Sequence, residues 1–308
     1  MKILVTGGTV FASRFTAEYF IKKGHEVYVL NRGTKSQPEG ARHIKCDRHN
    51  IGDRMKGMKF DLIADVTAYT EEDVKDLVTA LSDPDGGYSF DNYVFISSSA
   101  VYPETLPQPF REEQRCGENK HWGDYGLNKL AAERYLRENV PNAYILRPPY
   151  LYGQMNNLYR EAFVFECAEK GLPFYVPGNG EMPLQFFHIE DLCGFIEIIT
   201  EKRPEQKIYN VGNSETVTVN DWVRLCYNVV GKTPEIVSVS GHDPRSYFCF
   251  RDYGYMLNTS RQHELMPNEK PLETGLAEAY EWYRENRDKV RKKDYLEYID
   301  ANLKEYRK

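Results

Sequence analysis

The sequence predicts an α/β fold in which helices cover both faces of a doubly wound parallel sheet, followed by a smaller mixed lobe. Three observations lead to this prediction. Through the first half of the chain, short apolar runs alternate with helical patterns, as in sheets built from strand–helix–strand units. After Pro148-Pro149 the alternation becomes irregular, and prolines and aromatic residues become more frequent. The length of 308 residues suits one large domain with a smaller lobe.

The expected elements follow in chain order. In the first half, strands are predicted over 2–6, 26–30, 42–46, 61–65, 93–97 and 143–147. Helices are predicted over 13–23, 71–81 and 125–139. Gly24 is expected to end the first helix in a left-handed conformation, and a turn over Asp83–Gly87 is expected to end the second.

The second half is expected to hold a strand over 185–188, a helix over 190–200, a mixed region over 216–266 and an amphipathic helix over 271–286. The last twenty residues are highly charged, but apolar side chains recur there at helical steps, at Leu296, Ile299, Leu303 and Tyr306. A solvated helix with one packing stripe explains this pattern better than disorder.

Composition narrows the function classes. A net charge of -6, from 40 basic and 46 acidic residues, lacks the basic excess of nucleic-acid-binding proteins, so no nucleic acid partner is expected. No apolar run approaches the roughly 20 residues that span a bilayer. The chain enters a strand pattern at once, without a signal peptide, so we expect a cytoplasmic protein that does not bind membranes. The six cysteines are scattered and no His pair has zinc-ligand spacing, so we expect reduced thiols and no metal.

A glycine-bearing turn joins the first strand to the first helix, in the segment Thr6-Gly7-Gly8-Thr9-Val10-Phe11-Ala12-Ser13. Such a turn lets backbone amides approach a pyrophosphate, whose charge the helix N-terminus favours. Its position predicts a Rossmann-type dinucleotide site with these binding residues: Gly7, Gly8, Thr9, Val10 and Phe11. The usual second and third glycines would fall at Val10 and Ser13, so the motif is altered, and a turn without a ligand is the alternative.

The second strand leads into Asn31-Arg32, where NAD sites normally place an acid for the ribose 2′-hydroxyl. Because that carboxylate is absent and Arg32 and Lys35 follow, NADP is somewhat favoured over NAD; an exposed basic turn is the alternative. Asp47 is a candidate to bond the adenine amine, although loop aspartates also form turns. Further cofactor contacts are expected near the ends of other strands, at Val66, Thr67, Ser97 and Pro148.

Tyr125 and Lys129 lie four residues apart in a predicted helix and therefore share one face. A lysine cation beside a phenol favours the phenolate and lowers a pKa that is otherwise about 10. The pair would supply an acid/base group that works near neutral pH, and the lysine could also hold the nicotinamide ribose. The preceding strand ends in Ser97-Ser98-Ser99, where a hydroxyl would face the same crevice and could hold the substrate oxygen.

Together these motifs resemble the short-chain dehydrogenase/reductase superfamily in its extended form, the NAD-dependent epimerase/dehydratase family, over nearly the whole chain. The resemblance rests on the order and spacing of the segments 6–8, 96–102, 125–129, 146–153, 185–192, 209–212 and 281–283. The altered glycine loop, and the lack of an evident asparagine in the helix over 71–81, resemble an atypical subgroup. That subgroup keeps the Ser-Tyr-Lys site but has poorly defined substrates.

The resemblance implies catalytic roles for three residues. Tyr125 would be the acid/base, Lys129 its partner, and Ser98 the catalytic serine, with Ser99 as the less favoured choice. It also implies that Pro148-Pro149 begins the loop along the nicotinamide. His188 is expected to be structural more often than functional.

The resemblance further implies candidate substrate contacts at Ser99, Gln185, Arg245 and Arg251. Gln185 stands where sugar-nucleotide enzymes often carry an arginine, and the two arginines could meet a diphosphate, although surface or ion-pair roles are the alternative. Ser99-Ala100 replaces the Asp-Glu pair of the family's 4,6-dehydratases. Dehydration therefore ranks below epimerisation or reduction.

The resemblance also implies a domain and subunit organisation. Residues 1–155 and about 184–212 are expected to form the dinucleotide-binding domain, and about 156–183 and 213–308 the substrate-binding lobe. Family members often pair through the helix that carries the tyrosine, so a homodimer is expected. Its stripe would be Leu127, Leu130, Ala131 and Tyr135, which could instead pack on the sheet.

The sequence thus predicts an NAD- or NADP-dependent enzyme that transfers hydride at a hydroxyl or keto carbon of a small polar substrate, expected to be a nucleotide-sugar. Epimerase and reductase both stay open. The alternative is a non-catalytic NAD(P)-sensing regulator or an RNA-associated protein on the same fold, because chloroplast stem-loop-binding proteins have a similar glycine loop.

Overall fold

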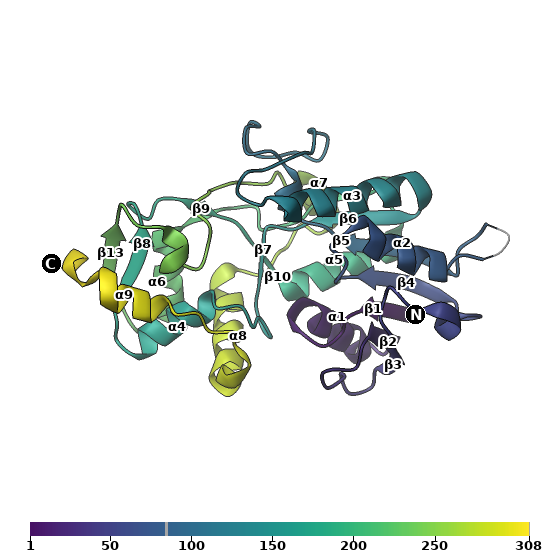
Figure 1. Cartoon of the computed structure of the whole chain (residues 1–308), viewed down its shortest axis with the longest axis horizontal. Helices are drawn as coiled ribbons and strands as arrows, with labels where there is room; N and C mark the ends of the chain where they lie inside the picture. Colours follow the sequence, from purple (N-terminus) through teal and green to yellow (C-terminus); the bar gives the residue numbers. More distant parts are fainter. Residues whose placement is uncertain (84–85, 308) are drawn as a thin grey trace.

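The computed structural model describes residues 1–83 and 86–307, and its largest unit is a seven-stranded sheet (Figure 1). The strands are ordered β11-β6-β5-β4-β1-β2-β3. Their bounds are β1 (Lys2–Thr6), β2 (Glu26–Asn31), β3 (Arg42–Lys45), β4 (Phe60–Asp65), β5 (Phe90–Ile96), β6 (Ala143–Arg147) and β11 (Ile208–Asn210). All neighbouring pairs are parallel, which confirms the predicted doubly wound α/β architecture.

Helices cover both faces of the sheet because successive strand residues point to opposite sides. In β1, Ile3 and Val5 join the apolar layer beneath α1 (Phe11–Lys22) and α5 (Ile189–Lys202). Leu4 points into the opposite layer, beneath α2 (Glu71–Ala80) and α3 (Asp124–Asn139). The strand order reverses between β1 and β4, so the crevice outside their carboxyl ends is the expected ligand site of such a sheet.

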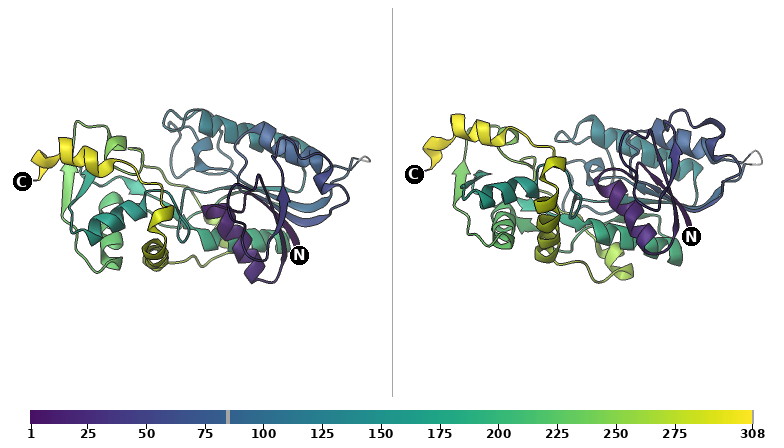
Figure 2. Two further views of the ribbon diagram at one scale, coloured as in Figure 1. Left: turned by 60° about the horizontal axis from the view of Figure 1, so that its bottom comes forward. Right: turned by 90° about the horizontal axis from the view of Figure 1, so that it is seen from below.

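A smaller lobe lies at the end of the molecule that carries the C-terminus, away from the sheet (Figures 1 and 2). It contains α4 (Glu161–Glu169), β8 (Phe174–Pro177), α6 (Val219–Val229), β13 (Ile236–Val239), α8 (Leu272–Glu285) and α9 (Tyr295–Asn302). Trp222 and Phe248 are fully buried in its apolar core. Short strands also pair outside the large sheet. Among them, β7 (Tyr150–Tyr152) pairs with β10 (Phe186–His188). In addition, β9 (Pro183–Leu184) pairs with β12 (Val217–Thr218).

Most predicted elements of the large domain are confirmed, and β1 and β6 have the predicted bounds. α1 begins at Phe11, two residues before the predicted start. Gly24 has φ +83°, as its stop role requires. The predicted turn over Asp83–Gly87 includes residues 84–85, which lie outside the described part of the chain. The short strands β7, β8, β9, β11, β12 and β13 were not predicted individually, because two to four residues show no usable periodicity.

The C-terminal region divides between the two units. Ile299 and Leu303 are buried as the predicted stripe requires. By contrast, α7 (Ser260–Leu265) packs on β11, and Met266 joins the apolar layer beneath α5. Part of the predicted substrate lobe therefore lies on the large domain; the domain division otherwise stays a prediction.

The predicted dimer stripe on α3 also divides. Leu130 is buried in the core, whereas Leu127 is 40% exposed and Ala131 and Tyr135 are half-buried. A homodimer stays a prediction.

All six cysteines are free thiols. Within residues 1–83 and 86–307, we find no helix with the length and apolar character to cross a membrane.

Candidate active site

The glycine loop is shaped by two residues that must lack a side chain. Gly7 and Gly8 have φ +81° and +74°. A Cβ at Gly7 would lie 2.6 Å from Thr67 Cγ2, and one at Gly8 2.4 Å from Val29 Cγ1. Val10, at the N-cap of α1, makes no side-chain capping hydrogen bond, and the first turn holds no acid. The loop therefore approaches the sheet closely and leaves amides at the N-terminus of α1 available to an anion.

Asn31 holds the loop in place from the end of β2. Its Nδ2 donates to the Gly7 carbonyl at 2.6 Å and to Gln37 Oε1 at 2.8 Å, and its Oδ1 accepts from the Gly33 amide at 2.8 Å. Where NAD sites normally carry an acid, this chain therefore uses an amide for internal contacts. Arg32 is exposed beside it.

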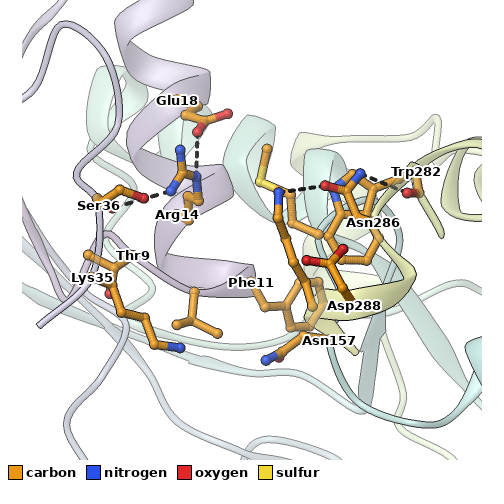
Figure 3. A pocket seen from close by; sticks show the side chains of 13 residues that line it. Thr9, Phe11, Arg14, Glu18, Lys35, Ser36, Asn157, Trp282, Asn286 and Asp288 are labelled. Carbon is orange, nitrogen blue, oxygen red and sulfur yellow. Dashed lines mark hydrogen bonds and ion pairs between the residues drawn. The ribbon is translucent and has the colours of Figure 1, made fainter. Parts of the chain in front are cut away.

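A cavity of about 360 Å³ opens at the carboxyl ends of β1 to β4, and we call it the adenosine cavity. Its lining includes five predicted cofactor residues: Gly7, Asn31, Arg32, Asp47 and Thr67. It also includes the unpredicted cation Arg48, together with Thr6 and His49. Thr9, Val10 and Phe11 instead line a larger cavity of about 770 Å³ on the other side of the loop, facing Trp282 and Asn286 of the smaller lobe (Figure 3). Eight of the predicted cofactor residues thus line one of these two cavities, whereas the other five line neither: Gly8, Val66, Ser97, Lys129 and Pro148.

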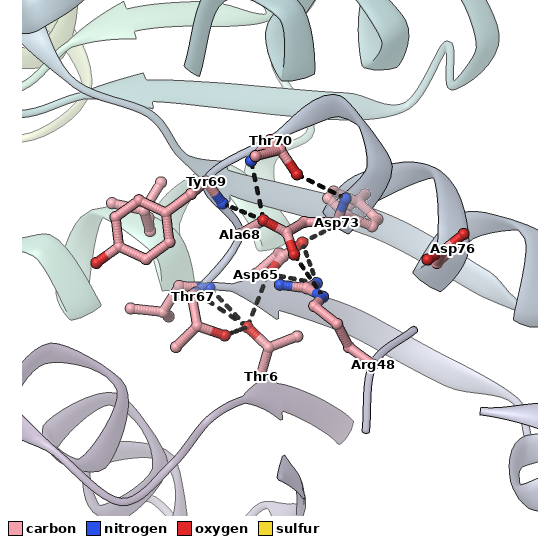
Figure 4. Close-up of polar contacts among 12 residues, drawn as sticks. Thr6, Arg48, Asp65, Thr67, Ala68, Tyr69, Thr70, Asp73 and Asp76 are labelled. Atoms are coloured by element: carbon pink, nitrogen blue, oxygen red, sulfur yellow. Dashed lines mark hydrogen bonds and ion pairs between the residues drawn. The ribbon is translucent and has the colours of Figure 1, made fainter. Parts of the chain in front are cut away.

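A buried polar cluster beneath the adenosine cavity was missed from the sequence (Figure 4). Asp65, at the end of β4, is fully buried and accepts from Thr6 Oγ1 at 2.7 Å and from Arg48 Nη2 at 3.0 Å. Thr6 Oγ1 in turn accepts from the amides of Val66 and Thr67 at 3.0 and 3.1 Å. The cluster therefore fastens the loop after β4 to the end of β1.

Arg48 has donors to spare in this cluster. Its Nε and Nη1 are buried and, among the described residues, make no hydrogen bond, although Nε lies 3.8 Å from the Asp73 carboxylate as an ion pair. Buried donors without partners are rare because each one loses its hydrogen bond to water. Since Arg48 lines the adenosine cavity and its Nε faces Asp73, Nη1 is the donor available to a ligand there. The sequence signal was only a charged residue after a strand, which also fits a turn.

Tyr125 and Ser98 are brought together by a glycine in α3. A Cβ on Gly126 would lie 2.3 Å from the Ala100 carbonyl oxygen, so only glycine lets α3 approach the segment after β5 this closely. The Ser98 hydroxyl lies close enough to Tyr125 to act to lower its pKa, but burial outweighs this and raises the pKa of Tyr125 overall. The half-buried Tyr125 is therefore a neutral phenol, able to give a proton at neutral pH.

Lys129 makes its hydrogen bonds to backbone carbonyls at the strand ends. Its Nζ donates to the carbonyls of Ala68 and Ile96 at 2.6 and 2.7 Å, and burial lowers its pKa to about 8. The charge that lowers the pKa of Tyr125 comes from Arg160. The Tyr69 ring lies beside both groups, 5.0 Å from Lys129 Nζ and 6.0 Å from the Tyr125 ring. The ammonium of Lys129 is thus held at the strand ends, and its expected effect on the pKa of Tyr125 stays a prediction.

Two of the predicted serines serve the protein itself. Ser97 Oγ donates at 2.5 Å to the buried Glu133, which also pairs with Arg147. Ser99 Oγ donates at 2.9 Å to the Tyr255 hydroxyl. The arrangement therefore argues against side-chain contacts of Ser97 with the cofactor and of Ser99 with the substrate. Ser98 is left as the serine beside Tyr125.

Gln185 is likewise occupied. Its Nε2 donates to the Asn213 carbonyl at 2.7 Å, its Oε1 accepts from the Leu257 amide at 2.7 Å, and the side chain is buried. The predicted substrate contact is not supported by this geometry. His188 caps α5, accepting from the Glu190 amide at 3.3 Å, and burial lowers its pKa to about 3. A structural role for His188 fits these contacts.

A cavity of about 320 Å³ lies beside Tyr125, and we call it the cationic pocket. Its lining is Trp122, Tyr150, Leu158, Tyr159, Arg160, Arg245, Cys249, Phe250, Arg251, Arg291, Lys293 and Tyr295. The Trp122 ring lies 6.2 Å from Tyr125 and carries the Arg251 guanidinium 4.9 Å above it. Arg245 and Arg251 were predicted as substrate contacts; Arg160, Arg291 and Lys293 were not, because their surroundings show no recognisable motif.

The comparisons with known proteins identify the family of the chain. Residues 3–212 match the model of the NAD dependent epimerase/dehydratase family. The chain is 26% identical to the chloroplast stem-loop binding protein of 41 kDa b of Arabidopsis thaliana, over 91% of this chain and 78% of the relative. It is 26% identical to the GDP-L-fucose synthase of Escherichia coli, over 64% of this chain and 68% of the relative.

Solved structures share the fold at low sequence identity. The dTDP-glucose 4,6-dehydratase of Bacillus anthracis, solved with NAD, has a TM-score of 0.75 at 20% identity, covering 94% of this chain and 98% of the other. The UDP-glucose 4-epimerase of Thermotoga maritima, solved with UDP-glucose, has a TM-score of 0.73 at 20% identity, covering 93% and 100%. With a family model matched over most of its length, the chain belongs to the NAD dependent epimerase/dehydratase family.

Proposed function

We propose that this protein transfers hydride at a hydroxyl or keto carbon of a nucleotide-sugar, with Tyr125 as the acid/base. The observation that carries the proposal is the placement of Tyr125 and Ser98. They lie close together after the carboxyl end of β5, and the Trp122 ring of the cationic pocket lies 6.2 Å from the Tyr125 ring. A sugar carbon between them would meet both the hydride and the proton.

The residues present suit a nicotinamide dinucleotide. Glycines at the loop let the backbone approach the sheet closely. The N-terminus of α1 has no capping side chain, and the buried Nη1 of Arg48 would donate to the nucleoside. When bound, the dinucleotide supplies or accepts the hydride. Asn31 and Arg32 support NADP over NAD. A carboxylate at this position would repel a 2′-phosphate, and this chain has none there.

Tyr125 moves the proton. In reduction its phenol donates to the developing alkoxide, while Ser98 holds the same oxygen by a hydrogen bond. In oxidation the Tyr125 phenolate takes the proton from the substrate hydroxyl. The charge of Arg160 stabilises this phenolate. Because burial raises the pKa of Tyr125, its phenol holds its proton until the alkoxide develops.

Epimerisation and reduction fit the site better than dehydration. Elimination of water needs an acid and a base beside the reacting carbons. Ser99 is bonded to Tyr255 and Ala100 is fully buried, so this segment offers no carboxylate. We therefore keep the order epimerase or reductase before dehydratase.

A second candidate function is RNA association without catalysis. The similarity to a chloroplast stem-loop binding protein favours it, as do the arginines and aromatic rings of the cationic pocket. RNA binding that weakens steeply with salt, together with no dinucleotide affinity, would support this function instead.

The test is a nucleotide-sugar panel followed at the reduced-nicotinamide absorbance. Loss of the acid/base in Tyr125→Phe should lower kcat by about 10² to 10⁴-fold. Tyr135→Phe is the matched control, because Tyr135 lies on the same helix away from the cationic pocket and should keep full activity. Equal activity of Tyr125→Phe and wild type would remove Tyr125 from the mechanism.

A further inference from the structure

We propose that the sugar of the substrate carries an acidic group, a carboxylate or a phosphate, in addition to the nucleotide diphosphate, and that the cationic pocket binds it. This inference rests on the proposed function, because it names the substrate class of the same site. Two independent features of the pocket carry it. One is an excess of positive charge, and the other is a buried hydroxyl without a partner.

The positive charge of the pocket is not balanced by the protein. Five of its lining residues are cations, and in the described part of the chain no acid lines it. None of the five forms an ion pair with a described carboxylate; the residues are Arg160, Arg245, Arg251, Arg291 and Lys293. Arg160 and Arg251 are half-buried and lie over aromatic rings of the lining, those of Tyr150 and Trp122. The other three cations are exposed.

The cations of the pocket act on one another. Burial, Arg245 and Arg160 all lower the pKa of Lys293, which shows that its ammonium sits in a field of like charge. The nearby carboxyl of Glu161 is fully buried and accepts from Asn156 at 2.8 Å, and burial raises its pKa. Glu161 does not line the pocket, although the charge of Arg160 reaches its carboxyl and acts to lower its pKa. An anionic ligand would relieve this repulsion.

The amount of charge exceeds what a simple nucleotide-sugar brings. A diphosphate between nucleoside and sugar carries two ionised groups, which would occupy only some of the cations. A carboxylate or phosphate on the sugar would supply the next negative charge. Arg160 is placed to receive it, because it is the cation whose charge reaches Tyr125, where the sugar reacts.

Tyr150 provides the second, independent feature. Its side chain is 6% exposed and lines the pocket, yet its hydroxyl is buried and makes no hydrogen bond with any described residue. The Arg160 guanidinium lies 5.0 Å from its ring, and the Trp122 ring 6.4 Å. Burial raises the pKa of Tyr150 to about 12, so the hydroxyl keeps its proton as a donor. Tyr150 and Arg160 would thus hold one acidic group between them.

The experiment compares ligands that differ only in the acid. Calorimetric titration of the cofactor-loaded enzyme would use UDP-glucose against UDP-glucuronate, and GDP-mannose against GDP-mannuronate. In the series that binds, the acidic member should bind at least about tenfold more tightly, as one charge-assisted hydrogen bond predicts. Arg160→Gln and Tyr150→Phe should each weaken the acidic member about tenfold and the neutral member less than about threefold.

Controls separate this inference from folding effects and from the proposed function. Arg224→Gln removes an exposed arginine paired with Asp221 and should leave both affinities unchanged. Lys293→Gln changes an exposed side chain of the pocket without disturbing the core, and should weaken the acidic member selectively. Equal binding of the two members, or equal losses in the variants, would overturn the acidic-sugar proposal while leaving nucleotide-sugar binding intact. Failure of every nucleotide-sugar to bind would overturn the proposed function and this inference together.

Discussion

Replacement of Gly126 by alanine tests how α3 positions the acid/base. The added Cβ would begin 2.3 Å from the Ala100 carbonyl oxygen and 3.1 Å from its carbonyl carbon. Ordinary contact begins at 3.4 Å, so α3 or the segment after β5 must shift by about 1.1 Å. Overpacking of this size costs about 1–3 kcal/mol, offset by about 1 kcal/mol from the better helix propensity of alanine.

The shift would separate Tyr125 from Ser98, and a misplacement of about 1 Å can lower a rate about 10²-fold. Gly194→Ala is the matched control, because Gly194 is also helical but meets only Tyr19 Oη, at 3.9 Å. Urea unfolding should show Gly126→Ala destabilised by up to about 2 kcal/mol and Gly194→Ala unchanged or slightly stabilised. Steady-state kinetics should show a loss of kcat in Gly126→Ala alone. A fully stable and active Gly126→Ala would refute the reasoning.

Three further predictions concern the buried charges and the glycine loop. Because burial lowers the pKa of Lys129 from 10.5 to about 8, the unfolded chain binds more protons between these values, and stability should rise with pH across that window. Urea unfolding at pH 8 and pH 10 should show that Lys129→Met loses this rise. Glu133→Gln leaves the buried Arg147 unpaired and should cost about 3–5 kcal/mol in denaturant unfolding; a loss below about 1 kcal/mol would contradict the buried pair. Asn31→Asp should shift dinucleotide preference from NADP towards NAD in calorimetric titration, and an unchanged preference would mean that this position does not read the ribose.

Much of the fold could be predicted because it depends on periodicity. Apolar strands and amphipathic helices of the large domain are long enough to show their pattern. The meeting of Tyr125 and Ser98 could also be predicted, because parallel strands place their carboxyl ends at one edge of the sheet. The role of Gly126 was not foreseen, since a glycine inside a helix carries no sign of what packs against it.

Other parts of the site could not be read from the sequence, for two physical reasons. Side-chain direction is set by tertiary contacts, so the spacing of Lys129 from Tyr125 did not reveal that its ammonium bonds to Ala68 and Ile96. Isolated charged residues after strands look like turn formers, so Arg48 gave no sign of its contact with Asp65. The cationic pocket gathers residues from distant, irregular segments of the smaller lobe, where no periodic pattern joins them.

The central claim is that Tyr125 gives the proton when hydride reaches the sugar. Its most direct test is a single turnover with reduced nicotinamide cofactor, deuterated at both positions of the hydride-donating carbon, and a keto nucleotide-sugar that binds. The account predicts one deuterium on the new carbinol carbon with the wild-type enzyme, and transfer slowed by about 10²-fold or more in Tyr125→Phe. Deuterium transfer at the wild-type rate in Tyr125→Phe, or no transfer by the wild type to any nucleotide-sugar that binds, would contradict it.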